Sequence, residues 1–215
     1  MHNTDRSLSW DDHIQYIYIC KKISKSSGYL SKLRHCVSTD TLISVYYALV
    51  HSYLRYGISS WGSATDNALQ PLISLVNRVV RIMTFAPFGN IDIDSIYKYL
   101  DIPKVENTVS LETGKFIFKR ENELLPMPGI ADHFRQRNEN VHHNYNLRNR
   151  NIFTPNIDFK SAVGKKSIQF RGAKLWNTLP ENIRNSESLK IFKRKLKEHL
   201  FDDSTLDDSN IYFCN

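Results

Sequence analysis

The chain has 215 residues, of which 41% are hydrophobic and 24% are charged, with a formal net charge of +7. This composition argues against a chain that is disordered throughout, and the length suffices for one large domain or two small ones. The longest apolar stretch, Leu42 to Val50, is far shorter than the roughly 20 residues that cross a bilayer, and the polar N-terminus lacks the apolar core of a signal peptide. We expect an intracellular protein, nuclear or cytoplasmic, that is neither secreted nor transmembrane.

Helical patterns begin near the N-terminus. A capping-box pattern precedes Trp10, and apolar residues then recur at helical spacing, which predicts a first helix from about that residue. The tripeptide at 26–28, Ser-Ser-Gly, is predicted to interrupt or end this helix. The clearest pattern extends from Thr41 to Tyr53 and predicts a second helix, for which Ser38 or Thr39 can supply the cap.

Three further helices are predicted before the proline-rich stretch that follows residue 125. They cover about 66–83, 94–100 and 105–125. Asp66 can cap the first of them, and Arg78 and Arg81 lie off its apolar stripe, where they are free to face solvent or a phosphate. We therefore expect a flexible N-terminus over 1–9 and a helical, bundle-like region over 10–129.

The C-terminal part has a different pattern. Helical periodicity fails over 130–166, which should be mostly loop, whereas the alternation at Ser167–Phe170 predicts a short strand and Lys174–Leu179 a helical turn. Ser186 can cap a final amphipathic helix. Its predicted inward residues are Leu189, Phe192, Leu196 and Leu200, and its predicted outer residues are Lys190, Lys193, Arg194, Lys195 and Lys197. The fold class expected is mostly α, with a basic, loop-rich region over 130–200 and an acidic tail over 201–215.

The positive charge is concentrated in this C-terminal region. From Ala131 to Leu200 there are 15 Lys and Arg against 6 Asp and Glu, a net charge of +9, whereas the rest of the chain has 14 against 16. A localised basic block indicates a polyanionic partner, most often a nucleic acid, and a solvated surface without a ligand is the alternative on charge alone. We expect this region to carry most of the affinity for RNA.

The common motifs of catalysis and cofactor binding are missing from the sequence. None of the eight glycines belongs to a GxGxxG or GxxxxGK pattern, and the three cysteines form no CxxC pair. Asp11 and Asp12 are the nearest match to the paired aspartates that hold metal ions in polymerases. A serine stands where an aromatic residue is expected before them, so we interpret the pair as a helix start. We expect no cofactor, no bound metal and no enzymatic activity in this chain.

Five sequence blocks, in order, carry a resemblance to a known family. They are Trp10–Ile14 with Lys22–Lys25 and Gly28–Arg34, Tyr46–Gly57 with Trp61–Gly62, Val76–Ile82, His143–Arg148, and Phe170–Pro180 with Leu189–Lys197. Together they resemble the thumb and post-thumb region of jockey-like non-LTR (LINE-type) retrotransposon reverse transcriptases. The parent activity that this resemblance implies is RNA-directed DNA synthesis. The endonuclease domain, the fingers and the palm with its metal-binding aspartates would lie upstream of Ser9.

The resemblance implies a non-catalytic segment that grips an RNA template or an RNA–DNA hybrid, with no membrane and no small-molecule substrate as partner. The candidate binding residues are Arg78, Arg81, Tyr145, Arg148, Arg150, Lys165, Lys166, Arg171 and Lys174, and Trp61 and Trp176 are expected to be structural. Arg and Lys suit phosphates because they carry charged donors. Tyr145 and Phe170 can stack on unpaired bases or serve as core aromatics, and the sequence leaves both alternatives open.

Two alternatives remain open at this stage. The chain could be a helical module that binds an acidic protein, in which case an exposed apolar stripe is expected on the helix over Thr41–Tyr53. It could also be a non-functional remnant of a mobile element. The sequence does not separate a truncated gene, a decayed copy and a host protein that retains only this region.

Overall fold

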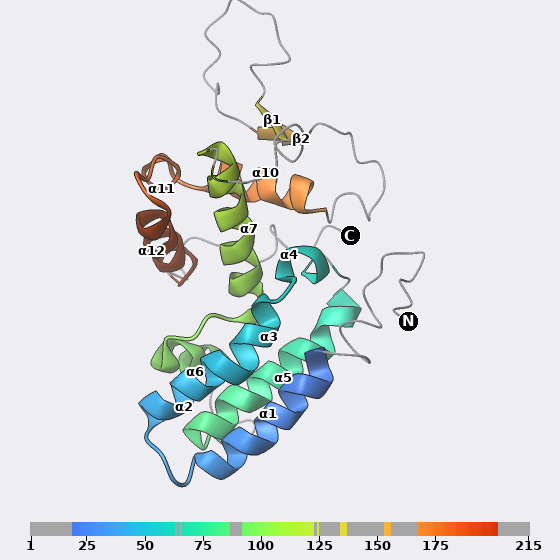
Figure 1. Ribbon diagram of the computed structural model, residues 1–215, viewed down its shortest axis with the longest axis vertical. Helices are drawn as coiled ribbons and strands as arrows, with labels where there is room; N and C mark the ends of the chain where they lie inside the picture. Colours follow the sequence, from blue (N-terminus) through green and yellow to red (C-terminus); the bar gives the residue numbers. More distant parts are fainter. Residues whose placement is uncertain are drawn as a thin grey trace, which may run out of the picture. The chain divides into compact units, whose positions relative to one another are not determined.

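The computed structural model describes residues 19–62, 64, 66–86, 92–122, 124, 134–136, 153–155 and 167–201. Most of them are helical, so the mostly α class is confirmed (Figure 1). The chain divides into two compact units, Met1–Val109 and Ser110–Asn215, and the boundary falls inside one helix. The sequence composition places the boundary between the helical and the basic region near residue 130, about 20 residues after the boundary between the two units. The expected helix start at Trp10, the Asp11–Asp12 pair and the acidic tail lie outside the described residues.

The first unit is a set of helices packed around a long central one. Its elements are α1 (Ile19–Leu33), α2 (Thr39–Tyr46), η2 (Tyr47–His51), α3 (Ser52–Arg55), α4 (Ile58–Trp61), α5 (Asp66–Thr84), α6 (Ile93–Leu100) and the first residues of α7 (Val105–Glu121). Helices α1, α2 and α6 all pack against α5 (Figure 1). The buried residues of α5 include Leu72, Val76 and Met83, which share one helix face because their spacing approximates whole turns. The sequence therefore predicted the central helix and its inward face correctly.

Trp61 belongs to the core of this unit. Its side chain is buried and its indole N–H donates a hydrogen bond of 2.9 Å to the carbonyl of Tyr56. A buried indole needs such a partner because an unpaired donor loses its bonds to water on folding. The residue therefore has a structural position.

Helix α1 runs without interruption through the Ser-Ser-Gly tripeptide, so the predicted break at 26–28 is wrong. Ser26 and Ser27 are buried, and the Ser26 hydroxyl donates to the Lys22 carbonyl one turn back in the same helix, at 3.0 Å. The same hydroxyl lies 3.0 Å from the Leu49 carbonyl, which it can bond in the neighbouring segment. Small serines fit where α1 meets that segment, so they join two elements instead of ending one.

The helix expected over Thr41–Tyr53 contains an irregular turn. The π-helical segment η2 (Tyr47–His51) separates α2 from α3, and α1 packs against it. A π turn widens the helix and shifts the hydrogen bonds by one residue, so a carbonyl in it can accept from outside the helix. The bond from Ser26 to Leu49 is of this kind.

Helices α5 and α6 end in the same type of C-terminal motif. After α5, the N–H of Phe85 donates to the Ile82 carbonyl at 3.5 Å and the N–H of Ala86 to the Arg81 carbonyl at 3.1 Å, which is the Schellman pattern. The residue after such a helix adopts a left-handed conformation, with φ of 56° at Phe85 and 50° at Asp101. Glycine usually fills this position, because the left-handed conformation costs other residues roughly 1–2 kcal/mol of conformational energy. Aspartate is among the tolerated residues, whereas phenylalanine is unusual.

The second unit has a small aromatic core. Its elements are the remainder of α7, β1 (Phe134–Gln136), β2 (Phe153–Pro155), α10 (Ile168–Thr178), α11 (Glu181–Arg184) and α12 (Leu189–Phe201). The ring of Phe192 stacks on Phe118 with a centroid distance of 4.4 Å and lies 5.9 Å from the ring of Trp176. All three side chains are buried, so Trp176 is a core residue. The two strands pair antiparallel, with Arg135 opposite Thr154.

Two local predictions for the second unit are wrong. The strand expected over Ser167–Phe170 is the beginning of α10, because the Ser167 hydroxyl accepts from the Phe170 N–H at 3.3 Å and caps the helix. The final helix is capped by Ser188, which accepts from the Ile191 N–H at 3.3 Å, and not by Ser186, whose buried hydroxyl donates to the Ile183 carbonyl. The inward face of α12 is as predicted, with Phe192, Leu196 and Leu200 buried and Leu189 packed against them.

Candidate nucleic-acid interface

The structure describes four of the nine candidate binding residues. Arg78 is exposed and Arg81 is half-buried, both on α5 of the first unit, whereas Arg171 and Lys174 are half-buried on α10 of the second unit. Arg81, Arg171 and Lys174 each interact with another group of the chain. The other candidates lie outside the described residues: Tyr145, Arg148, Arg150, Lys165 and Lys166. The four described candidates are therefore divided equally between the two units.

A basic surface that the sequence analysis did not single out lies on α1. Lys21, Lys25 and Lys32 are exposed, and we call these three residues the α1 stripe. They lie on the helix face opposite Ile23 and Leu30, which are completely buried, because their spacing of four and seven residues returns to the same side of a helix. At 1.5 Å per residue the stripe spans about 16 Å. One strand of a duplex presents a phosphate about every 3.4 Å along the duplex axis, so this length corresponds to about five phosphates.

An aromatic side chain lies within the α1 stripe. Tyr29 is 58% exposed, although tyrosine has enough apolar surface to favour burial. Beside it, Gly28 has no atom within 4 Å of the place where a Cβ would lie, so the helix backbone is accessible at this point. An exposed aromatic ring among cations is the combination with which proteins hold single-stranded nucleic acids.

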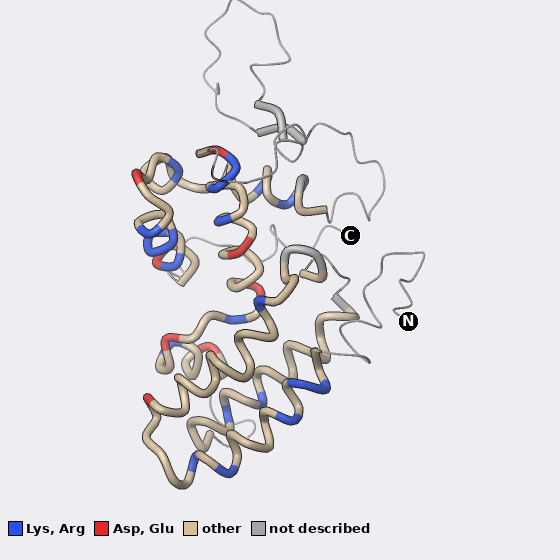
Figure 2. The backbone as a smooth tube through the Cα atoms, viewed as in Figure 1, with Lys and Arg blue, Asp and Glu red and all other residues tan. Residues whose placement is uncertain are grey.

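The described acidic side chains of the first unit belong to elements other than α1, and Lys98 and Lys104 lie among them. Helix α1 contains no acidic residue, and its neighbour α5 adds the exposed Arg78. The acidic side chains whose burial is described lie on or beside α2, α6 and the start of α7: Asp40, Asp92, Asp94, Asp101 and Glu106. Figure 2 shows the two groups, with Lys and Arg along α1 and α5 and with Asp and Glu at the start of α2 and around α6. Among the side chains of α1 itself, a polyanion that approaches this helix therefore meets positive charge only.

The second unit has a comparable surface on α12. Three basic residues of α12 are exposed, Lys190, Lys193 and Arg194, and we call them the α12 stripe. Arg194 lies opposite the buried Phe192 and Leu196, whereas Lys193 lies at the edge of the buried face. Figure 2 shows that α12 is rich in Lys and Arg. Arg194 lies 3.9 Å from Glu198, and both side chains are about 70% exposed. Such an exposed pair is weak, so it leaves Arg194 available to a phosphate. This surface is the outer face that the helical pattern predicted.

The perturbed titratable groups do not indicate a reactive site. Burial raises the pKa of the hydroxyls of Tyr46 and Tyr97, and burial raises the pKa of the Cys20 thiol. Each shift arises first from packing in the core, and the Tyr97 hydroxyl donates to Asn77 at 2.7 Å. Within the described segments, no group of three His, Cys, Asp or Glu side chains is arranged to hold a metal ion. No described helix is both long and apolar enough to cross a bilayer.

Comparison with protein-family models, with curated proteins and with solved structures finds no match to this chain.

Proposed function

We propose that this chain binds RNA or an RNA–DNA hybrid through its phosphates and acts without catalysing a reaction itself. The observation that carries the proposal is the pair of basic stripes, each made of exposed residues on a helix that buries another face. The rigid helices fix the backbone positions of the basic residues before binding, so the conformational entropy lost on binding is mainly that of the Lys and Arg side chains. Contacts to phosphates position a strand without selecting its sequence.

Nucleic acid is favoured over an acidic protein by the side chains around the cations. Tyr29 offers a ring for stacking within the α1 stripe. The helical segment over 41–53, where a protein partner would require an apolar stripe, has mostly small or polar exposed residues. They are Thr41, Ser44, Tyr47, Ala48 and Ser52. Tyr47 is 37% exposed, and its hydroxyl lies 3.4 Å from the Asp101 carbonyl.

The resemblance to jockey-like non-LTR reverse transcriptases adds the type of nucleic acid to this proposal. We propose that the chain corresponds to the non-catalytic C-terminal part of such an enzyme, in which it would grip the RNA template or the hybrid. Both nucleic acids present closely spaced phosphates, and the α1 stripe is long enough to contact several of them, whereas the α12 stripe, about 6 Å long, can contact about two.

The test is a fluorescence-anisotropy titration of a labelled single-stranded RNA and a labelled RNA–DNA hybrid. Four proteins are compared: the full chain and three variants that each replace three basic residues with glutamine. The variants change Lys21, Lys25 and Lys32, or Lys190, Lys193 and Arg194, or, as the charge-matched control, Arg55, Lys98 and Lys104. We expect each stripe variant to bind roughly tenfold or more weakly than the control variant at the same low salt concentration.

Two outcomes contradict the proposal. If the stripe variants bind as tightly as the control variant, the stripes are not the binding surface. If polyglutamate competes as well as RNA of equal charge, the surface recognises acidic polypeptides and the protein-interaction alternative is correct. A further variant tests the basic residues that the sequence favoured, by replacing Arg148, Arg150, Lys165, Lys166, Arg171 and Lys174 with glutamine.

A further inference from the structure

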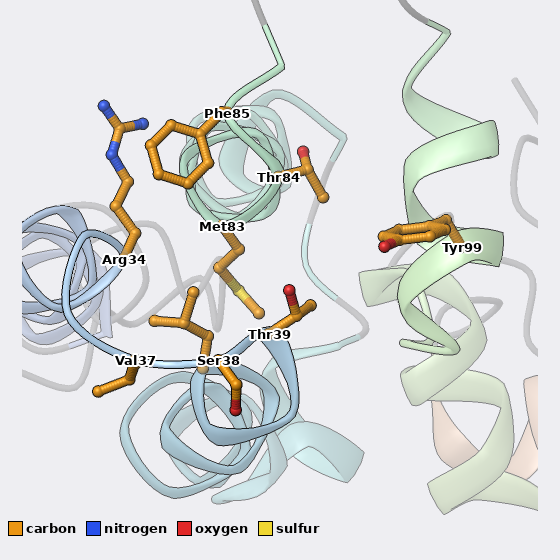
Figure 3. A pocket seen from close by; sticks show the side chains of 9 residues that line it. Arg34, Val37, Ser38, Thr39, Met83, Thr84, Phe85 and Tyr99 are labelled. Atoms are coloured by element: carbon orange, nitrogen blue, oxygen red, sulfur yellow. The ribbon is translucent and has the colours of Figure 1, made fainter.

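A pocket of about 370 Å³ lies in the first unit where the end of α5 meets the turn between α1 and α2, with α6 on its far side (Figure 3). Its lining residues are Arg34, Val37, Ser38, Thr39, Leu42, Met83, Thr84, Phe85 and Tyr99. Leu42 and Met83 are buried and give the pocket an apolar floor. This volume is at the lower end of the range of small-ligand sites in proteins.

Two exposed aromatic side chains belong to this pocket. Phe85 is 54% exposed and Tyr99 is 74% exposed. Phe85 occupies the left-handed position after α5, where glycine is usual, so its backbone is strained. The strained residue places an aromatic ring at the pocket. An unusual backbone conformation of this kind occurs preferentially where a side chain serves binding.

Arg34 holds the ring of Phe85 in place. Its guanidinium carbon lies 4.3 Å from the centre of that ring, and one of its nitrogens donates to the Ile82 carbonyl at 3.3 Å. The His35 ring meets the same ring edge-on, with a centroid distance of 5.3 Å. These contacts fix the ring and place a permanent positive charge beside the pocket.

The pocket also offers hydroxyl groups for hydrogen bonding. The hydroxyls of Thr39 and Tyr99 make no hydrogen bond to any described residue. In Figure 3 the Tyr99 hydroxyl and the Thr39 side chain both point toward the space between α5 and α6. A hydroxyl both donates and accepts, so the two groups can meet the polar edge of a flat ring that rests on the apolar floor.

We propose that this pocket accepts one unpaired nucleobase of a bound RNA strand. An unpaired base is a flat ring with apolar faces and a polar edge, which matches aromatic walls, an apolar floor and the hydroxyls of Thr39 and Tyr99. The positive charge of Arg34 can attract the phosphate beside the base. The proposal rests on the proposed function and refines it. Lys32, the last residue of the α1 stripe, precedes Arg34 by two positions, so the stripe and the pocket meet at the same end of α1.

Base capture here predicts a preference for single strands, because a base in a duplex is paired and stacked and cannot enter the pocket. The experiment uses three forms of one short RNA: the intact single strand, the same strand with abasic sites in its central positions, and the duplex. The intact strand should bind roughly tenfold more tightly than the abasic strand, since one base stacked on an aromatic side chain contributes about that factor.

The test variant replaces Phe85 with Asn and Tyr99 with Ala. Asparagine tolerates the left-handed conformation, so the end of α5 should remain intact, and circular dichroism checks this. The control is Tyr56→Ala, which removes another exposed tyrosine, 70% exposed, that does not line the pocket. The test variant should lose most of the preference for intact over abasic RNA and keep only the part due to Tyr29, whereas the control should keep the full preference of the parent. Photo-crosslinking with 4-thiouridine should attach RNA to the segment that carries Phe85 or Tyr99.

The possible failures are distinguishable. If the parent binds RNA with a normal salt dependence but does not discriminate against abasic RNA, the base pocket is refuted while the phosphate-binding function stands. The same holds if the crosslinks map elsewhere and the test variant keeps the preference. If the parent binds none of the three RNAs at low salt, the proposed function and the base pocket both fail.

Discussion

The same substitution, glycine to alanine, should have opposite effects at two helical positions. Gly28 lies within α1 and Gly114 within α7, and neither is at a helix end. In an exposed helix interior, alanine is more stable than glycine by about 0.8–1 kcal/mol. At Gly28 no atom lies within 4 Å of the added Cβ, so Gly28→Ala should increase the free energy of unfolding by about that amount.

At Gly114 the added Cβ would lie 2.6 Å from the Cδ2 atom of Leu196, which is completely buried. Carbon atoms pack at about 3.5–4.0 Å, and an extra carbon in a packed core typically costs 1–3 kcal/mol. The gain in helix propensity offsets roughly 1 kcal/mol of this packing cost. The net effect of Gly114→Ala should therefore be a decrease of up to about 2 kcal/mol in the free energy of unfolding.

Equilibrium urea denaturation monitored by circular dichroism measures both changes. The gain in helix propensity is common to the two variants. The difference between their changes in the free energy of unfolding therefore reports only how the added methyl group packs at each position. A loss of stability in Gly28→Ala would show that α1 does end at its Ser-Ser-Gly tripeptide with Gly28 in a left-handed conformation. Equal gains in both variants would contradict the packing of α12 on α7.

Two further predictions concern the cores. Trp176→Ala should destabilise the second unit by about 3–5 kcal/mol, because it removes a buried ring that packs against Phe192; an unchanged thermal midpoint would show that the indole is exposed. Tyr46→Phe should stabilise the first unit by about 1 kcal/mol, since the buried Tyr46 hydroxyl has no hydrogen-bond partner among the described residues. Burial also raises the pKa of this hydroxyl above its ordinary value, so the folded state keeps its proton when the unfolded state has lost it. Stability should then be complete below about pH 10 and fall as the pH rises above it, and Tyr46→Phe should weaken this fall in alkaline urea titrations.

The long helices were predictable from the sequence because their apolar residues repeat over several turns. Helices α5 and α12 each bury such a repeat, with Val76 and Leu196 at the centre of their respective faces. Short or irregular features were not predictable in this way. The four residues Ser167–Phe170 are too few to distinguish alternation in a strand from the first turn of a helix. A π turn leaves no periodic signal, because it adds one residue to one turn of a helix.

The candidate surfaces were predictable only in part. The outer face of α12 follows from the helical pattern, since basic residues alternate with the buried Phe192 and Leu196. The α1 stripe was missed because a count of charges along the sequence includes the acidic residues of α2 and α6, which lie away from it in the fold. The pocket beside Phe85 had no sequence signal, because no glycine or asparagine marks that left-handed helix end.

The salt dependence of RNA binding tests the central claim most directly. The logarithm of the association constant for single-stranded RNA is measured against the logarithm of salt concentration for the full chain, for the variant with glutamine at Lys21, Lys25 and Lys32, and for the control variant at Arg55, Lys98 and Lys104. Each phosphate contact to a single strand contributes about 0.7 to the slope, so loss of the α1 stripe should make the slope shallower by about 2 units while the control leaves it unchanged. Equal slopes for the two variants, or no RNA binding by the full chain at low salt, would contradict the claim that the outer face of α1 binds phosphates.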